Sequence, residues 1–92
     1  MSANDENLVI VGKKATLNYV VACLTLFNSG AEQIKIKARG LTISRAIETV
    51  EMLKNSFLKD LKINNIAIGS QNYNKLGKSR RISTIEIDLT KT

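Results

Sequence analysis

The architecture of this chain follows from the segment Ile34-Lys35-Ile36-Lys37-Ala38-Arg39, in which apolar and basic side chains alternate without exception. Successive side chains of a β-strand point to opposite faces of the sheet, so the alternation places the apolar side chains on one face and the cations on the other. The segment therefore predicts a strand with one buried face and one basic, solvent-exposed face.

On both sides of this strand the apolar residues change to the spacing of an α-helix. The helix before it is predicted from Leu17, Val20, Val21, Leu24 and Phe27, with Thr16 as its N-cap and Asn28-Ser29-Gly30 as its end. A second helix is predicted after Gly40. Its expected buried stripe consists of Ile43, Ala46, Ile47, Val50, Leu53 and Phe57, whereas Arg45, Glu48, Thr49 and Met52 lie off the stripe.

The two ends of the chain supply three more strands. Residues 8–11 are wholly apolar, which is typical of a strand covered on both faces or at least central in its sheet. Two runs near the C-terminus, residues 63–68 and 82–89, carry isoleucines at strand spacing and predict a hairpin. The resulting order, β-α-β-α-β-β, is a two-layer α/β sandwich with a mixed four-stranded sheet and a long C-terminal β-hairpin.

The length of 92 residues is enough for one domain, which we expect to span residues 8–92 after a flexible N-terminus of residues 1–7. A chain this short buries only roughly 60–65% of its unfolded surface, so a dimer would add apolar burial. The N-terminus carries Asp5 and Glu6 and lacks the apolar core of a signal peptide. No apolar run approaches the ~20 residues that span a bilayer. We therefore expect a cytoplasmic protein without a membrane partner.

The charge of the chain indicates an anionic partner. Its formal net charge is +6, and it contains no histidine that could alter this value near neutral pH. Four of the 14 basic residues fall within residues 75–81, between the two C-terminal strands, with no acid among them. Burying unpaired charges is costly, so this segment is either solvated surface or the arm that binds a polyanion such as a nucleic acid.

Few residues of this chain are suited to catalysis or metal binding. The single cysteine, Cys23, excludes an internal disulfide and a multi-thiolate metal site, and its apolar helical neighbours favour a buried packing role. The chain has no histidine and no cluster of carboxylates at metal-ligand spacing. We therefore expect neither enzyme activity nor a cofactor.

The predicted topology brings distant cations together. If the first three strands are parallel and joined by right-handed crossovers, their C-terminal ends share one edge of the sheet. Lys13 and Lys14 follow the first strand, Arg39 ends the second, and the basic hairpin continues the third. The first two groups also precede helix N-termini, where backbone N–H groups favour phosphate oxygens. These cations should therefore form one anion-binding edge.

Three blocks of the sequence carry a family resemblance. The first is Val9-Ile10-Val11-Gly12-Lys13-Lys14-Ala15-Thr16-Leu17-Asn18-Tyr19-Val20. The second is Ile36-Lys37-Ala38-Arg39-Gly40 with Ile43-Ser44-Arg45-Ala46, and the third is Gly69-Ser70-Gln71 with Arg81-Ile82-Ser83-Thr84-Ile85-Glu86-Ile87. These blocks resemble the Alba family, the small basic chromatin proteins of archaea. They occur in the family's order and spacing, and the resemblance covers roughly residues 8–91.

The resemblance implies a fold like the C-terminal domain of a bacterial translation initiation factor, and an obligate homodimer. It also implies binding of double-stranded DNA, and of RNA, with little sequence preference, for chromosome compaction at a chromosome-associated location. Family dimers rest their bodies on the duplex and extend two hairpin arms along the minor groove. They also pack side by side in arrays, and the family permits heterodimers with a paralogue.

Matching positions assign the binding residues that the resemblance implies: Lys13, Lys14, Arg39, Lys75, Lys78, Arg80 and Arg81. Lys13 also matches a lysine whose acetylation weakens DNA binding in some members, and Phe57 matches the aromatic of the contact between dimers. Three positions depart from the family pattern: Ala15 replaces a proline, Leu41 an arginine and Thr42 an alanine. The same binding mode is expected, with less charge in the loop before the second helix.

Three further residues are weaker candidates for binding nucleic acid: Asn18, Lys37 and Arg45. Arg45 is expected to face solvent. Lys35 is expected to pair with Glu86 and Asp88 across the strands, and Lys37 has the same alternative. Phe57 fits the core as well as an intermolecular contact.

Two other functions stay open on the sequence alone. The first is an RNA-directed role, as a ribonucleoprotein subunit or an RNA chaperone, which the sequence barely separates from DNA binding. The second is a protein-interaction scaffold whose basic edge binds an acidic partner. Competition between duplex DNA and structured RNA distinguishes the first of these, and loss of nucleic acid during purification favours the second.

Overall fold

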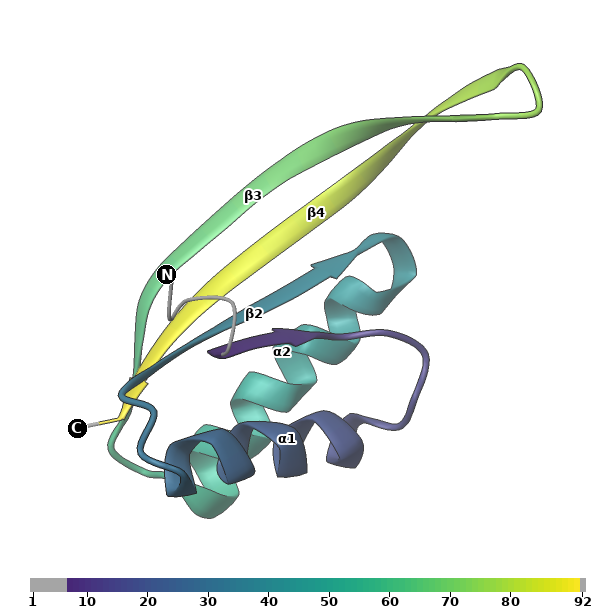
Figure 1. The fold of residues 1–92 in the computed structure, drawn as a ribbon. Coiled ribbons are helices and arrows are strands. Elements are labelled where there is room, and N and C mark those ends of the chain that lie inside the picture. The colour runs from purple at the N-terminus through teal and green to yellow at the C-terminus, as the bar shows by residue number, and fades with distance from the viewer. Residues whose placement is uncertain (1–6, 92) are drawn as a thin grey trace.

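The computed structural model describes residues 7–91 and consists of a four-stranded sheet with two helices on one of its faces (Figure 1). The strands are β1 (Leu8–Ile10), β2 (Gln33–Arg39), β3 (Leu61–Lys75) and β4 (Lys78–Lys91), and the helices are α1 (Thr16–Asn28) and α2 (Ile43–Met52). A 3-10 turn, η2 (Gly40–Thr42), precedes α2, and a π-helical turn, η3 (Leu53–Phe57), continues it. The predicted two-layer α/β sandwich with a C-terminal hairpin is confirmed. Most of the expected flexible N-terminus, residues 1–6, lies outside the described residues.

The strands are ordered β1-β2-β4-β3 in the sheet. β1 pairs with β2 in parallel, and β4 pairs antiparallel with both β2 and β3. β1, β2 and β3 therefore run in the same direction, as the sequence predicts, and their C-terminal ends point to the same edge of the sheet.

The core lies between the sheet and the two helices. The alternation of β2 is confirmed, because its apolar side chains are buried and its basic side chains are exposed. The largest fully buried side chains come from every layer: Ile34, Ile36, Leu53, Leu61, Leu89, Val20, Thr49 and Cys23. Burial of Cys23 is as predicted, and it raises the pKa of the thiol to about 12. Neither helix of residues 7–91 is long and apolar enough to cross a membrane.

The prediction that residues 8–11 form a central or doubly covered strand is wrong, because β1 lies at an edge of the sheet. Val9 and Val11 are buried under the helices, but Ile10 is 68% exposed. Both helices cover the same face of the sheet (Figure 1). Ile10 points to the other face, because side chains alternate along a strand, and it therefore remains in solvent.

The prediction that Thr16 caps α1 is also wrong, because the N-cap is Ala15. Thr16 is the first residue of the helix, and its hydroxyl donates a 3.0 Å hydrogen bond to Glu48 Oε1 of α2. Thr16 thus links the two helices. The expected stripe of α1 is shifted as well, since Leu17 and Val21 are exposed whereas Tyr19 is buried.

Two features of α2 differ from the predicted stripe. Thr49 is buried, although its residue type is polar, because its hydroxyl donates a 2.8 Å hydrogen bond to the Arg45 carbonyl. Ile47 and Phe57 are about half exposed, so the core interpretation of Phe57 does not hold. α2 packs against α1 and β2, and its buried side is centred on Ala46, Thr49, Val50 and Leu53.

The hairpin extends beyond the rest of the sheet (Figure 1). β2 pairs with β4 only as far as the Arg39–Thr84 pair, so residues 70–83, here called the arm, pair only with each other. Strand pairing continues to Lys75 and Lys78, and the tip is the two-residue turn Leu76-Gly77. The basic segment 75–81, expected to be the tip, therefore belongs mostly to paired strands.

Candidate functional site

The loop between β1 and α1, residues 11–15, is here called the lysine loop. Lys13 and Lys14 are both exposed in it. The backbone N–H groups of Gly12 and Lys14 donate hydrogen bonds of 2.9 and 3.0 Å to the same atom, Tyr19 Oη of α1. Because Tyr19 is itself buried, it fixes the backbone from which the two lysines project into solvent.

A second side chain holds the same loop from the other helix. Arg45 Nη1, in α2, donates a 2.9 Å hydrogen bond to the Gly12 carbonyl. Both polar groups of Gly12 are thus engaged, by Tyr19 and by Arg45. Arg45 is half-buried, so the expectation that it faces solvent is wrong. Its guanidinium positions the lysine loop.

The turn after β2, residues 39–42, is here called the arginine turn. Thr42 Oγ1 donates a 2.7 Å hydrogen bond to the Arg39 carbonyl and accepts one of 3.3 Å from the Arg39 N–H. The hydroxyl of Thr42, one of the departures from the family pattern, therefore closes this turn. Gly40 adopts a positive φ of 60° there, which few other residues tolerate. Arg39 is left exposed at the end of the strand.

The open face of the sheet carries a network of ion pairs. Lys35 Nζ lies 3.2 Å from Glu86 and 4.0 Å from Asp88, and Lys37 Nζ lies 3.6 Å from Glu86. The predicted pairing of Lys35 is confirmed. Its hydrogen bond with Glu86 raises the pKa of Lys35 and lowers the pKa of Glu86. Lys37, a candidate for binding nucleic acid, shares the same carboxylate and is therefore partly neutralised.

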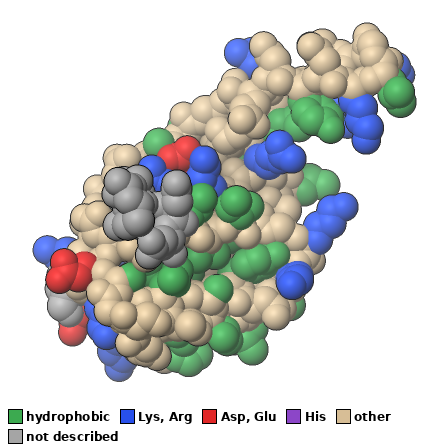
Figure 2. All heavy atoms as spheres, viewed as in Figure 1, with side chains coloured by type: hydrophobic (Ala, Val, Ile, Leu, Met, Phe, Trp, Pro, Cys, Tyr) green, Lys and Arg blue, Asp and Glu red, His purple; other side chains and the backbone are tan. Residues whose placement is uncertain are grey.

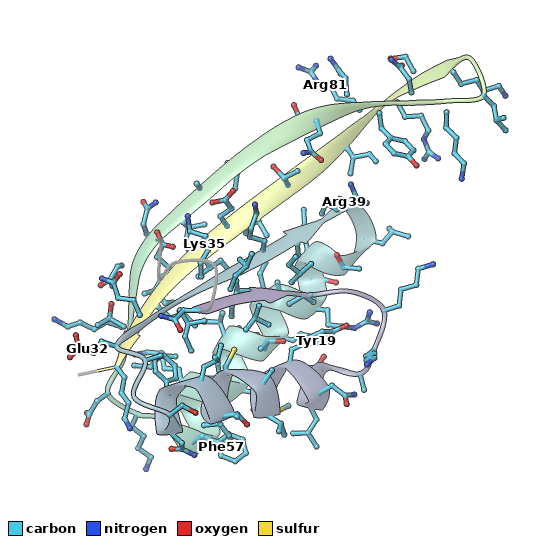
Figure 3. All side chains as sticks on the ribbon, viewed as in Figure 1. Tyr19, Glu32, Lys35, Arg39, Phe57 and Arg81 are labelled. Carbon is cyan, nitrogen blue, oxygen red and sulfur yellow. The ribbon has the colours of Figure 1, made fainter. Side chains whose placement is uncertain are left out.

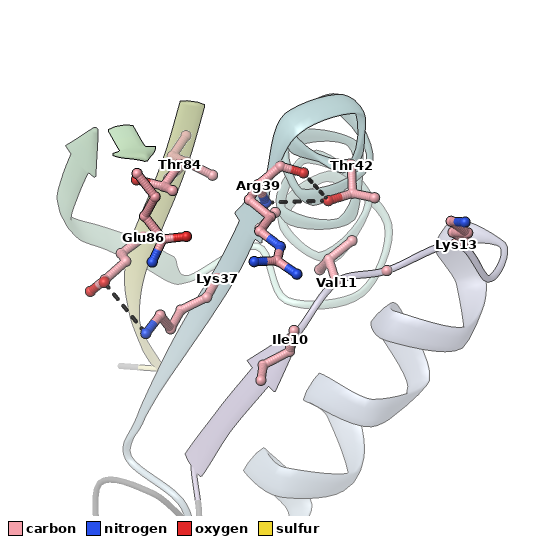
Figure 4. Close-up of a pocket in the computed structure, with 12 residues that line it drawn as sticks. Ile10, Val11, Lys13, Lys37, Arg39, Thr42, Thr84 and Glu86 are labelled. Carbon is pink, nitrogen blue, oxygen red and sulfur yellow. Dashed lines mark hydrogen bonds and ion pairs between the residues drawn. The ribbon is translucent and has the colours of Figure 1, made fainter. Parts of the chain in front are cut away.

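A groove of about 640 Å³ lies where this face meets the edge of the sheet (Figure 4). The exposed Ile10 of β1 forms part of its floor. Its basic lining residues are Lys37 and Arg39 of β2 and Lys13 of the lysine loop. Glu86 is the acid of its lining. The groove is therefore an open surface where anionic groups meet cations above an apolar floor.

The arm presents cations without acids. The sequence contains no Asp or Glu between Leu61 and Ile85. Lys75 and Lys78 are partners at the last rung of the ladder, and Arg80 lies opposite Tyr73. Arg81 Nε donates a 3.3 Å hydrogen bond to Ser70 Oγ of the neighbouring strand. The four cations are exposed, and strand pairing holds them at fixed spacing along the arm.

The lysine loop, the arginine turn and the arm leave the sheet at the same end, here called the basic edge (Figure 1). Figure 2 shows basic side chains along this edge and the arm. Arg39 and Arg81 lie toward this end, whereas Glu32 and Phe57 lie toward the opposite one (Figure 3). The predicted convergence of cations on one edge is confirmed.

Asn18 contributes less than expected to this edge. It is exposed in the first turn of α1, and its side-chain amide donates a 3.3 Å hydrogen bond to the Ala15 carbonyl. Tyr19, by contrast, was not among the predicted site residues. No spacing in the sequence identifies it, because its contact with the lysine loop exists only once α1 lies beside β1.

The basic edge suits anion binding better than acid–base or metal chemistry. Within residues 7–91, no group of three His, Cys, Asp or Glu side chains is placed to hold a metal ion. The cations instead project into solvent from segments that hydrogen bonds fix. Such a surface can contact several phosphates of one polymer at once.

Comparison with known proteins extends this picture. Residues 7–70 match the family model described as Alba. The chain is 44% identical over 86 residues to the DNA/RNA-binding protein Alba 1 of Archaeoglobus fulgidus, covering 94% of this chain and 97% of that protein. It is 42% identical to the DNA/RNA-binding protein Alba of Methanocella arvoryzae, covering 92% and 90% of the two chains. Its fold is similar to that of Alba from Thermoplasma volcanium, with a TM-score of 0.87, 42% identity, and coverage of 91% and 99%.

Proposed function

Because this chain belongs to the Alba family, we propose that it binds double-stranded DNA and RNA through the basic edge, with little sequence preference. The convergence of the lysine loop, the arginine turn and the arm on one end of the sheet carries this proposal. The two relatives are both named as DNA/RNA-binding proteins, which supports it.

Binding follows from charge. Lysines and arginines that contact phosphates release condensed counterions, so the logarithm of the affinity falls with the logarithm of salt concentration by about 0.9 per contact on B-form DNA. Contacts to the phosphate backbone position a protein without reading bases. The exposed cations of the basic edge lie on loops and a ribbon, and none of them lies on a helix face suited to the major groove.

A salt titration on unrelated duplexes tests this function. We expect several duplexes of different sequence to bind with similar affinity and the same steep salt slope. A strong preference for one sequence, or an affinity that salt does not change, contradicts the proposal. Competition with structured RNA at matched salt then ranks the two nucleic acids, and an RNA preference favours the role in a ribonucleoprotein or as an RNA chaperone.

We also propose that the protein acts as a homodimer whose interface includes the helix-side face of β3. Ile63, Ile66 and Ile68 pair with Leu89, Ile87 and Ile85 of β4 and so share the face of the core. They nevertheless stay exposed, Ile68 to 82%, because the helices lie under the other strands (Figure 1). A second copy that covers this apolar strip would remove it from water.

Replacing Ile66 and Ile68 with aspartate tests the interface by sedimentation equilibrium. We expect the wild type to have twice the 10.2 kDa chain mass and the double variant to be monomeric. Leu17→Asp, at an exposed apolar position of α1, is the control and should stay dimeric. A monomeric wild type contradicts the proposed dimer.

On the chromosome, we expect such dimers to compact DNA, because each dimer would carry two arms. Half-exposed Phe57 is the proposed contact between neighbouring dimers. A heterodimer with a paralogue is the alternative assembly. Phe57→Ala should therefore lower the cooperativity of binding and leave the dimer intact. Acetylation of Lys13 would remove one cation from the lysine loop, so Lys13→Gln should lower the affinity and the salt slope together.

A further inference from the structure

The tip of the arm contains an unusual residue. Leu76 and Gly77 form the two-residue turn between β3 and β4, with φ angles of 54° and 76°. Two positive φ angles are the signature of a type I′ hairpin turn, in which asparagine, aspartate or glycine is strongly preferred at the first position. A leucine is strained there, because its Cβ crowds the backbone in the left-handed region. Leu76 therefore works against the turn that it forms.

The side chain of Leu76 does not pack in the hydrophobic core either. It is 93% exposed, so it buries almost nothing against the rest of the chain. The arm carries it beyond the sheet and away from both helices (Figure 1). Exposure of a single leucine is ordinary, but a strained backbone at the same residue is a reason to look for a function, and contact with another molecule would bury this side chain.

The surroundings of Leu76 identify the kind of surface it meets. It follows Lys75 and precedes Gly77 and Lys78, and the two lysines are partners across the ladder. The minor groove of B-form DNA is only ~6 Å wide, so the two-residue turn at the tip is the part of the arm best able to enter it. Lys75 and Lys78, on either side of the turn, can then reach the phosphates that border the groove.

We propose that Leu76 is an apolar wedge that enters the base stack of double-stranded DNA from the minor groove and bends the duplex at that step. This inference rests on the proposed binding of DNA through the arm. Phosphates offer a leucine no apolar partner and deoxyribose edges cover it on one side only, whereas two separated bases cover it on both sides. Leucine is among the side chains that minor-groove proteins insert between base steps, and such insertion kinks the duplex by roughly 20–90°.

The wedge adds a preference that charge alone does not give. Pyrimidine–purine steps unstack and kink more readily than other steps. The protein should therefore bind duplexes of all sequences through its cations, and Leu76 should insert preferentially at the flexible steps. The preference should be weak, since the phosphate contacts contribute the same affinity at every site.

The variant Leu76→Asn separates the wedge from the rest of the arm. Asparagine is favoured at this turn position, so the variant keeps the hairpin and all of its charges. The control is Val21→Asn, which removes an exposed apolar side chain (53%) from α1, outside the basic edge. Bending is measured by energy transfer between the ends of a duplex of about 30 base pairs, and unstacking by the fluorescence of 2-aminopurine at a central TA step.

We expect the wild type and Val21→Asn to bend the duplex and to raise the 2-aminopurine signal. Leu76→Asn should lose most of both effects while its affinity falls less than about tenfold and its salt slope stays unchanged. A Leu76→Asn protein that binds and bends DNA like the wild type overturns the wedge and leaves the proposed function intact. Absence of any binding by the wild type overturns both. A bend that depends on the thymine methyl group, lost when deoxyuridine replaces thymidine, overturns the minor-groove placement.

Discussion

The lysine loop and the arm present the same kind of charge in two different ways. The lysine loop is fixed by side chains of the body, since Tyr19 and Arg45 together make three hydrogen bonds to its backbone. The arm is held only by the pairing of its own two strands, because beyond the Arg39–Thr84 pair it pairs with no other strand of the sheet. A substitution in the arm should therefore remove charge and little else, whereas a substitution near the lysine loop should alter geometry.

The largest effect is expected in the arm. Replacing Arg80 and Arg81 with alanine should weaken binding to unrelated duplexes by roughly tenfold or more and make the salt slope shallower by about 0.9 for each phosphate that the variant no longer binds. Thermal stability should stay unchanged, because both side chains are exposed. The control is Lys59→Ala with Lys62→Ala, which removes equal charge from the opposite end of the sheet. If both pairs of substitutions weaken binding equally, net charge and not the arm determines affinity.

The next effect tests whether Arg45 acts through geometry or through charge. Arg45→Lys keeps the charge but loses the directed hydrogen bond to the Gly12 carbonyl. We expect affinity to fall roughly threefold and the unfolding free energy to fall by about 1 kcal/mol, with the salt slope unchanged. Urea unfolding and binding at several salt concentrations measure both. A shallower slope for Arg45→Ala than for Arg45→Lys would instead make Arg45 a direct phosphate ligand.

A smaller loss of affinity is expected from Tyr19→Phe, which removes the one atom that accepts both N–H groups of the lysine loop. Unpairing these half-buried donors should cost about 1–2 kcal/mol of stability. Affinity should fall roughly twofold, because the lysines remain but lose their fixed backbone. Hydrogen exchange of the Gly12 and Lys14 amides should accelerate in this variant. Tyr73→Phe, in the exposed arm, is the control for stability and for amide exchange, and it should change neither.

The smallest effect concerns the ion pairs on the open face. Lys35 lowers the pKa of Glu86, so the ion pair is intact above that lowered pKa and is lost as the pH falls through it. At neutral pH Glu86 therefore holds Lys35 and Lys37. Glu86→Gln should free them and raise affinity by roughly twofold or less, with a slightly steeper salt slope. Glu32→Gln changes the net charge equally at the opposite end and should have no such effect.

Much of the fold was predictable because burial on one side of a sheet leaves a clear periodic signal. The alternation of residues 34–39 identified β2 and its basic face, and the right-handed crossover rule brought Lys13, Arg39 and the hairpin to one edge. The position of β1 was not predictable in the same way. A three-residue apolar strand has the same composition at the edge of a sheet as at its centre, and here the helices cover one face alone.

The tertiary contacts that position the site could not be predicted from the sequence pattern. Thr16 is a common N-cap residue type, but α2 supplies Glu48 as a partner, and this tertiary contact overrides the local preference. Tyr19 and Arg45 meet Gly12 from two helices that are separated in the chain, and only the packed structure reveals their shared role. The long hairpin was predicted, but the extent of its strand pairing was not, since polar residues 70–75 lack the alternation of a half-buried strand.

Amide chemical-shift mapping with a short DNA duplex tests the shared basic edge most directly. We expect the shifts to change in the lysine loop, in the arginine turn and along residues 70–83, and to stay constant around Glu32 and residues 59–62. Changes confined to one of these three segments, or centred on the opposite end of the sheet, would contradict binding through a single edge.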